Sequence, residues 1–133
     1  PLLTETGGAA KARIVMATVE GDIHDIGKNI VCLMLKNHGF EVIDLGKDVP
    51  AERIVAAASE HGASVIGLSA LMTTTMVRME DTVRLVREQG LTARIMVGGA
   101  VVTEAFAKSI GADAYATDAV DAVRQAKALA AGA

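Results

Sequence analysis

The chain of 133 residues is 51% hydrophobic but only 2% aromatic, and its formal net charge at pH 7 is −3. This length suits one domain with a buried core, while the scarcity of aromatic side chains and the absence of a basic balance argue against nucleic acid binding. No apolar run approaches the roughly 20 residues of a membrane span, no signal peptide is evident and Cys32 is the single cysteine, so we expect a cytoplasmic domain without disulfides.

The first segment, residues 1–10, begins with proline rather than methionine and contains two adjacent glycines. This composition predicts a flexible lead-in rather than a core element. We expect it to connect to an N-terminal module that is missing from this sequence. The domain itself is expected at residues 11–133.

Five apolar runs alternate with five helical patterns along the rest of the chain. The runs are rich in Val and Ile and mostly unbroken, which is typical of strands buried on both faces. They lie at 13–19, 41–45, 64–69, 93–97 and 112–115, and the predicted helices lie at 27–38, 51–61, 74–89, 103–110 and 118–130. Met79, Val83 and Val86 follow Met76 at helical spacing, a stripe that we expect to face the core.

Strict alternation of strand and helix predicts a doubly wound, flavodoxin-like α/β fold. We expect a five-stranded parallel sheet in the order 2-1-3-4-5 with helices on both faces. Ligands of such sheets bind outside the carboxyl ends of the strands, near the switch point between strands 1 and 3. His24, Ser69 and the pair Gly98 and Gly99 all fall at that edge, so we expect them to share one site.

A histidine follows an aspartate by two residues just after the first predicted strand. Asp22 and His24 can share one side of an extended loop, where a carboxylate fixes the tautomer of a metal-binding imidazole. The alternative is that Asp22 caps the next helix. His38 and His61 stand at predicted helix ends instead. A structural zinc site needs four ligands that this chain does not offer, so a metal at His24 must bring its other ligands with it, as a metallated macrocycle does.

Two further segments at this edge have more than one explanation. One of the threonines from Thr73 to Thr75 would cap the third predicted helix while the others fill a turn, or their hydroxyls would bind a polar ligand and one would stand behind Asp22. At Gly98 and Gly99, either a turn or the close approach of a ligand would explain two glycines.

Together these segments resemble the cobalamin-binding domain. The match has three parts, in the order of that family and near its spacing: Asp22-x-His24-x-x-Gly27, Ser69-x-Leu71 and Gly98-Gly99. It covers almost the whole chain from residue 11 onward. The fuller wording around His24 and Ser69 resembles the methyl-transfer branch, which holds cobalamin-dependent methionine synthase and the small corrinoid proteins of acetogen and methanogen methyltransferase systems.

The resemblance implies a metal ligand and two residues behind it. His24 would be the lower ligand to cobalt, in place of the cofactor's own benzimidazole, whose nucleotide tail is then detached. Asp22 would accept the His24 N–H. Thr75 would stand behind Asp22, where methionine synthase carries a serine, so that the three side chains form one catalytic relay.

The resemblance also implies contacts with the detached tail. Ser69 would touch the buried nucleotide base, with Leu71 and Thr73 lining its slot, and Gly98 and Gly99 would let the tail pass along the sheet. The implied cofactor contacts outside the relay are Asp25, Ile26, Gly27, Ser69, Leu71, Thr73, Gly98 and Gly99.

The implied function is that of a corrinoid methyl carrier, which takes a methyl group from a donor methyltransferase subunit and delivers it to an acceptor methyltransferase. A reductive activator and an N-terminal helical module over the methyl face are the other implied partners. Because no catalytic acid, base or substrate pocket is visible, the chain is expected to be a component of a methyltransferase system rather than a complete enzyme. Two alternatives stay open: the cobalamin subunit of an adenosylcobalamin-dependent isomerase, and a cobalamin-dependent sensor domain.

Overall fold

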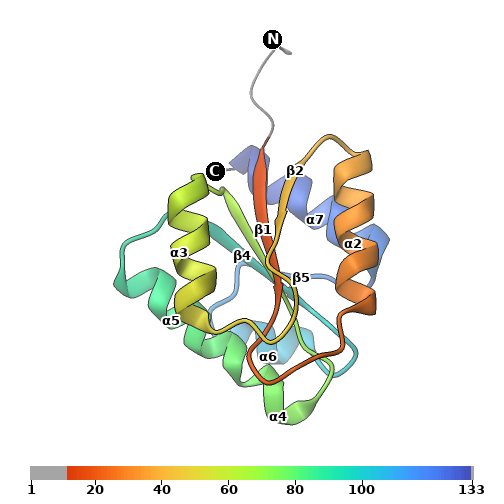
Figure 1. Ribbon diagram of the computed structural model, residues 1–133. Helices are drawn as coiled ribbons and strands as arrows, with labels where there is room; N and C mark the ends of the chain where they lie inside the picture. The colour runs from red at the N-terminus through yellow and green to blue at the C-terminus, as the bar shows by residue number, and fades with distance from the viewer. Residues whose placement is uncertain (1–11, 133) are drawn as a thin grey trace.

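Five parallel strands form one sheet in the order β2-β1-β3-β4-β5, which confirms the predicted topology. The computed structural model describes residues 12–132 (Figure 1), so the lead-in expected at residues 1–10 lies outside the described residues. The strands are β1 Arg13–Thr18, β2 Glu41–Asp44, β3 Val65–Ser69, β4 Arg94–Gly98 and β5 Ala114–Tyr115.

Helices cover both faces of the sheet, as Figure 1 shows. On one face lie α2 Ile26–Asn37 and α7 Ala119–Gly132, which contact each other; on the other lie α3 Ala51–His61 and α5 Arg78–Glu88, with α6 Glu104–Ser109. Alternate residues of β1 serve the two faces: Val15 packs in the cluster beneath α3 and α5, and Met16 in the cluster beneath α2 and α7. A strand buried on both sides therefore needs an unbroken apolar run, which explains the sequence pattern.

The single helix predicted at 74–89 is wrong, because two helices occupy this segment. A short helix, α4 Thr73–Met76, is followed by α5, and they meet at Val77. The Glu80 N–H bonds to the Val77 carbonyl, three residues back instead of four, so the regular helical ladder is interrupted here. β-Branched threonines are weak helix formers, which is consistent with a short first piece. Beyond the break, the predicted core stripe holds, since Met79, Val83 and Val86 are buried.

The loops after β1, β3, β4 and β5 all lie at one edge of the sheet, because the strands are parallel. A bridge between Val19 and Val49 extends this edge beyond the end of β1. Within residues 12–132 no helix is long and apolar enough to cross a membrane. The fold therefore presents one edge of loops, and the predicted site residues fall on it.

Candidate functional site

The carboxylate of Asp22 is the most heavily bonded side-chain group at this edge. Asp22 is fully buried and accepts four hydrogen bonds, two on each oxygen. Oδ1 accepts the backbone N–H of His24 at 2.9 Å and contacts His24 Nδ1 at 2.9 Å. Oδ2 accepts the backbone N–H of Leu71 at 2.7 Å and the hydroxyl of Thr75 at 2.6 Å. The loop after β1 and the segment after β3 thus meet on one carboxylate.

This bonding keeps Asp22 ionised. Burial by itself would raise the pKa of the carboxyl group. The donations from Thr75, Leu71 and His24 outweigh that effect and hold the pKa of Asp22 well below its usual range. A buried carboxylate with all acceptor positions occupied is a fixed negative charge, which suits the orientation of an imidazole.

The backbone of the loop is itself fixed, which sets the direction of the Asp22 side chain. The Asp22 N–H bonds to the Val19 carbonyl, and the Asp48 N–H bonds to the Asp22 carbonyl at 2.9 Å. The Asp48 carboxylate in turn accepts the N–H of Gly21 at 2.7 Å, where φ is +86° and glycine is favoured. The loop is therefore held in place by hydrogen bonds within the protein.

His24 has one nitrogen held and the other available. Since Asp22 offers only acceptors, we assign the ring hydrogen to Nδ1, which leaves the lone pair on Nε2. The His24 side chain is 45% exposed although its partner is fully buried. A partly exposed imidazole with a carboxylate on one nitrogen and a lone pair on the other has the form of a metal ligand.

Thr75 occupies the place behind Asp22, and the capping explanations fail. Helix α4 has Met72 at its N-cap and no side-chain cap bond, so none of the threonines caps it. Helix α2 has Asp25 at its N-cap, again without a side-chain bond, so Asp22 does not cap that helix. The buried Thr75 hydroxyl has the Met72 carbonyl within 3.0 Å, but the closer Asp22 carboxylate is the stronger acceptor.

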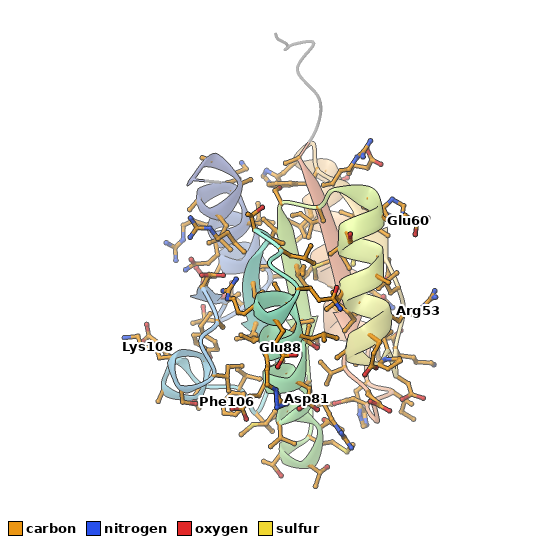
Figure 2. All side chains as sticks on the ribbon, turned by 90° about the vertical axis from the view of Figure 1, so that its left-hand side faces the viewer. Arg53, Glu60, Asp81, Glu88, Phe106 and Lys108 are labelled. Atoms are coloured by element: carbon orange, nitrogen blue, oxygen red, sulfur yellow. The ribbon has the colours of Figure 1, made fainter. Side chains whose placement is uncertain are left out.

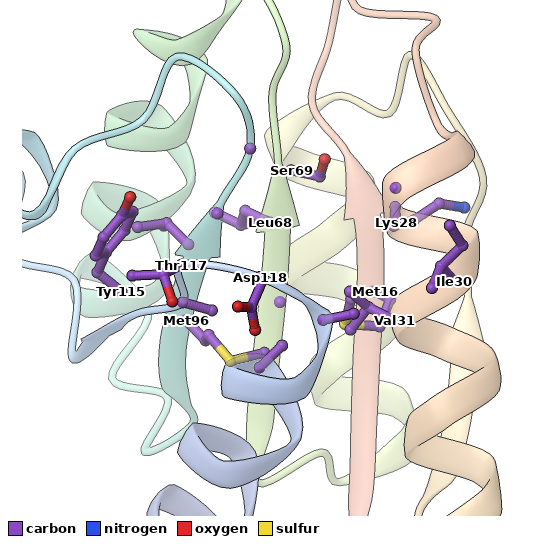
Figure 3. Close-up of a pocket in the computed structure, with 18 of the residues that line it drawn as sticks. Met16, Lys28, Ile30, Val31, Leu68, Ser69, Met96, Tyr115, Thr117 and Asp118 are labelled. Atoms are coloured by element: carbon purple, nitrogen blue, oxygen red, sulfur yellow. The ribbon is translucent and has the colours of Figure 1, made fainter.

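A pocket of about 420 Å³ opens next to this loop, between the sheet and the first turns of α2 and α7 (Figure 3). It brings together four of the predicted residues, which come from three different segments: Gly27, Ser69, Gly98 and Gly99. The remaining predicted residues lie outside its lining: Asp22, His24, Asp25, Ile26, Leu71, Thr73 and Thr75.

Leu71 and Thr73, which were expected to line the slot for the base, do not line this pocket. The chain leaves the sheet directly after Ser69, where Ala70 is buried. Leu71 then turns its N–H to Asp22, and its side chain is 40% exposed. Thr73 is exposed at the start of α4. Both residues belong to the surface around His24 rather than to the pocket.

The two adjacent glycines differ in what they require. At Gly99, φ is +132° and an added Cβ would lie 1.9 Å from the Ala70 carbonyl oxygen, so the turn itself demands glycine. At Gly98 an added Cβ would meet the Ala116 carbonyl oxygen at 3.3 Å, a tight contact without a strained φ. For Gly99 the turn explanation is sufficient. Gly98 has no side chain to fill the space next to Ala116, which follows β5 and also lines the pocket.

Several lining residues were missed by the sequence analysis. Met16, Gly67 and Met96 line the pocket from the interiors of β1, β3 and β4. A glycine inside a buried strand signals a close approach, so Gly67 could have been found. Residues 115–119 line it from the end of β5, and the carboxyl-edge rule could have been extended to that strand.

The surroundings of His24 fit a large ligand that carries its own metal ligands. In residues 12–132 no three His, Cys, Asp or Glu side chains gather where they could hold a metal ion. The large apolar side chains next to His24 in sequence are exposed, at 62% for Ile23 and 78% for Ile26, and Leu71 and Met72 are also exposed. Such an apolar patch typically marks a binding surface.

A second hollow, between α3 and α5, has a different character. Its lining includes Glu52, Asp81, Arg84 and Glu88, and Arg84 pairs with Asp81 at 2.6 Å. Figure 2 shows Asp81 and Glu88 on this side of the molecule, which is covered with charged side chains. The exposed pair of Arg84 and Asp81 needs no ligand, so the His24 edge with its pocket is the stronger candidate site.

Comparison with known proteins gives a family and several relatives of the chain. The B12 binding domain family matches residues 12–124. The chain is 55% identical over 118 residues to dimethylamine corrinoid protein 2 of Methanosarcina acetivorans, which is 87% of this chain and 55% of that protein. It therefore spans about half the length of this relative.

Two solved structures have the same fold. A cobalamin-binding protein from Desulfitobacterium hafniense superposes with a TM-score of 0.86 at 41% identity, over 90% of this chain and 59% of that one. The methanol:cobalamin methyltransferase complex MtaBC from Methanosarcina barkeri superposes with a TM-score of 0.88 at 37% identity, over 96% of this chain and 50% of the matched one.

Proposed function

The chain belongs to the B12-binding domain family, and from this premise we propose that it is the corrinoid-binding part of a methyl carrier. In this role it holds a cobamide with His24 as lower ligand and moves a methyl group between a donor methyltransferase subunit and an acceptor methyltransferase. The observation that carries the proposal is the His24 imidazole, which a buried carboxylate holds at Nδ1 although the His24 side chain is 45% exposed.

Each residue of the relay has a task in this proposal. Nε2 of His24 is the nitrogen that would hold the cobalt, since Nδ1 is committed to Asp22. Asp22 orients the ring and makes it a better donor, and Thr75 and the Leu71 N–H keep the carboxylate in place. When bound, the corrinoid supplies a cobalt that accepts a methyl group and gives it up again.

The relay also has a role in this proposal when His24 is not a metal ligand. Nε2 is then without a metal, and the fixed charge of Asp22 still holds the ring through Nδ1. Since the pKa of Asp22 is held low, the carboxylate stays ionised in this situation as well. His24 would thus keep its orientation whether or not it holds the cobalt.

The pocket beside the relay is proposed to take the nucleotide tail. Ser69 and Gly98 line it near the end of the sheet, and Gly27 lines it where an added Cβ would meet nothing within 4 Å. Asp25, Ile26, Leu71 and Thr73 stay proposed contacts to the corrin from the surface around His24.

The named relatives support the methyl-transfer branch. One is a dimethylamine corrinoid protein, and one solved structure is a complex with a methyltransferase. These names favour a carrier over the isomerase subunit and the sensor domain. The particular donor and acceptor, a reductive activator and an N-terminal helical module are part of the proposal.

Reconstitution with hydroxocobalamin tests the proposal. We expect the wild-type protein to bind it and to show the visible spectrum of histidine-ligated cobalt, and we expect His24→Gly to lose that spectrum and to bind more weakly. His61→Gln, which changes a histidine at the end of α3, is the matched control and should behave like wild type. An unchanged spectrum and affinity in His24→Gly would exclude His24 as the ligand.

The carrier role has its own test. The reduced, loaded protein should accept a methyl group from a methylated donor subunit. Failure with every donor tried, together with radical chemistry of bound adenosylcobalamin, would favour the isomerase alternative.

A further inference from the structure

The inner end of the pocket is built by three residues that lie side by side on neighbouring strands. Met16 of β1 pairs in register with Gly67 of β3, and Gly67 pairs with Met96 of β4. All three line the pocket, and each methionine is only 3% exposed. Figure 3 shows Met16 and Met96 deeper along the strands than Ser69, which lies near the end of β3.

The methionine side chains meet over the glycine. A Cβ added at Gly67 would lie 2.3 Å from Met16 Sδ, 3.1 Å from Met16 Cε and 3.6 Å from Met96 Cε. The space above Gly67 is thus already filled by two thioether side chains, which form the floor of the pocket. Ile14 and Val65, one step further down their strands on the same face, are fully buried, so the pocket ends at this floor.

The pocket changes character from its mouth to its floor. Ser69, Thr117 and Asp118 line the outer part, and their side chains carry hydroxyl or carboxylate groups. Thr117 and Asp118 are exposed, while the floor is buried and has only carbon and sulfur atoms in its side chains. A ligand that fits this gradient keeps its polar part at the mouth and leads with a flat apolar edge.

We propose that Met16, Gly67 and Met96 set the depth of the pocket and thereby select the lower base of the corrinoid. The inference rests on the proposed function and adds a specificity for it: a bicyclic aromatic base that enters with its apolar edge leading. Thioether sulfur makes favourable contacts with aromatic ring edges, and flexible methionines adapt to the edge they meet. A base whose leading edge carries ring nitrogens or an amine finds no partner on this floor.

Binding of three corrinoids distinguishes the contribution of the pocket floor from that of the rest of the site. Cobalamin carries a dimethylbenzimidazole base, an adenine-containing cobamide carries a polar one, and cobinamide lacks the nucleotide altogether. We expect the wild-type protein to bind cobalamin at least about tenfold more tightly than the adenine-containing cobamide, because the latter leaves polar groups unpaired.

Gly67→Ala tests the depth of the pocket. The added methyl group raises the floor, so we expect the affinity for cobalamin to fall on the order of tenfold or more while the affinity for cobinamide changes less than about twofold. Met16→Ala in the same chain removes the side chain that the new methyl group meets, so the double variant should recover much of the loss. Ile66→Val, on the opposite face of β3, is the matched control and should leave the order of the affinities for the three corrinoids unchanged.

Thermal unfolding of each variant shows whether it is folded. If Gly67→Ala does not fold, Met16→Ala and Met96→Ala decide the matter, since each should weaken cobalamin binding severalfold and spare cobinamide. Equal affinity of the wild type for both base-containing ligands, or equal loss of cobalamin and cobinamide in the floor variants, would overturn the inference. A wild-type protein that binds none of the three corrinoids would instead overturn the proposed function.

Discussion

Thr75 donates its hydroxyl hydrogen to Asp22 at 2.6 Å, across 53 residues of sequence. This bond joins the loop after β1 to the first turn of α4, and the Leu71 N–H joins the same carboxylate at 2.7 Å. The position of the His24 ring is therefore set by two separate segments of the chain. A substitution at Asp22 should therefore remove hydrogen bonds from both segments.

Replacing Asp22 with Asn should damage the site more than the loss of one charge would suggest. Each carboxylate oxygen faces two donors, so the amide nitrogen of Asn opposes donors in either orientation. We expect corrinoid affinity or transfer rate to fall on the order of 10–100-fold, and the free energy of unfolding of the apo protein to fall by about 2 kcal/mol. Titration with hydroxocobalamin and urea denaturation measure the two effects. Asp81→Asn on exposed α5 is the control, and a variant Asp22→Asn that matches it would contradict the proposed relay.

The two glycines after β4 should respond differently to the same substitution. Gly99→Ala drives a Cβ into the backbone of Ala70, which cannot move like a side chain, and places alanine at a φ of +132°. We expect at least about 3 kcal/mol of destabilisation or failure to fold. Gly98→Ala should fold with a small loss of stability, because its contact is 3.3 Å. Equal thermal stability of the two variants would show that the turn does not require Gly99.

The pair of Lys28 and Asp44 should show an asymmetric response. Lys28 Nζ lies 2.6 Å from Asp44 Oδ1, but the lysine side chain is 1% exposed and the aspartate 35%. Asp44→Ala leaves the buried ammonium group of Lys28 without its carboxylate partner, for which we expect about 3 kcal/mol of destabilisation. Lys28→Met leaves a carboxylate that is partly hydrated and still bonded to the Gly46 N–H, so no more than about 1 kcal/mol should be lost. Urea denaturation measures both, and a larger loss for Lys28→Met would contradict this explanation.

Asp121 should contribute stability that disappears in acid. The Thr117 N–H donates to Asp121 Oδ2 at 2.9 Å and, despite the opposing effect of burial, holds the pKa of Asp121 below its usual value. The Thr117 hydroxyl and the Arg124 guanidinium lower it further. Because the folded pKa is below the unfolded value of about 3.9, the contribution is present above that pH and is lost as the pH falls toward the folded value.

The measurement for Asp121 compares wild type and Asp121→Asn by urea denaturation at pH 6 and pH 3. The wild type should be the more stable at pH 6, and the difference should narrow at pH 3. Glu52→Gln, an exposed carboxylate in the first turn of α3, is the control for the effect of a charge near a helix start. A difference that stays constant over this range would show that the Asp121 contribution does not depend on its ionisation.

Replacing Thr18 with a residue of the same shape that lacks the hydroxyl should stabilise the protein. It is fully buried at the end of β1, in register with Ser69, and among the described residues its Oγ1 has no hydrogen-bond partner. Thr18→Val keeps the shape and removes the unpaired group, so we expect the apo protein to gain about 1 kcal/mol. Thermal unfolding checks this, with Thr18→Ser as the variant that keeps the hydroxyl and should not gain.

The parts of the site that were predictable are those encoded by short-range spacing. His24 follows Asp22 by two positions, and an extended loop of that length lets their side chains meet, as they do at 2.9 Å. Thr75 was proposed to stand behind Asp22 only through the resemblance. The residues themselves could not distinguish it from Thr73 or Thr74, because which hydroxyl reaches Asp22 depends on the path of the chain after β3.

Other differences have the same origin. Leu71 and Thr73 were expected to line the slot for the base, but they do not line the pocket, because the chain turns away after Ser69 and no local pattern encodes the direction of that turn. The break at Val77 lies within a sequence whose helical periodicity is continuous, so periodicity alone could not reveal it.

The sequence by itself determined the alternation of strands and helices and the edge on which the predicted site residues lie, because burial on both faces imposes unbroken apolar runs and parallel strands share one carboxyl edge. Only the tertiary structure decided that Asp22 has its four donors and that Met16, Gly67 and Met96 close one pocket. Those contacts depend on cross-strand register and loop direction, which join residues far apart in the chain.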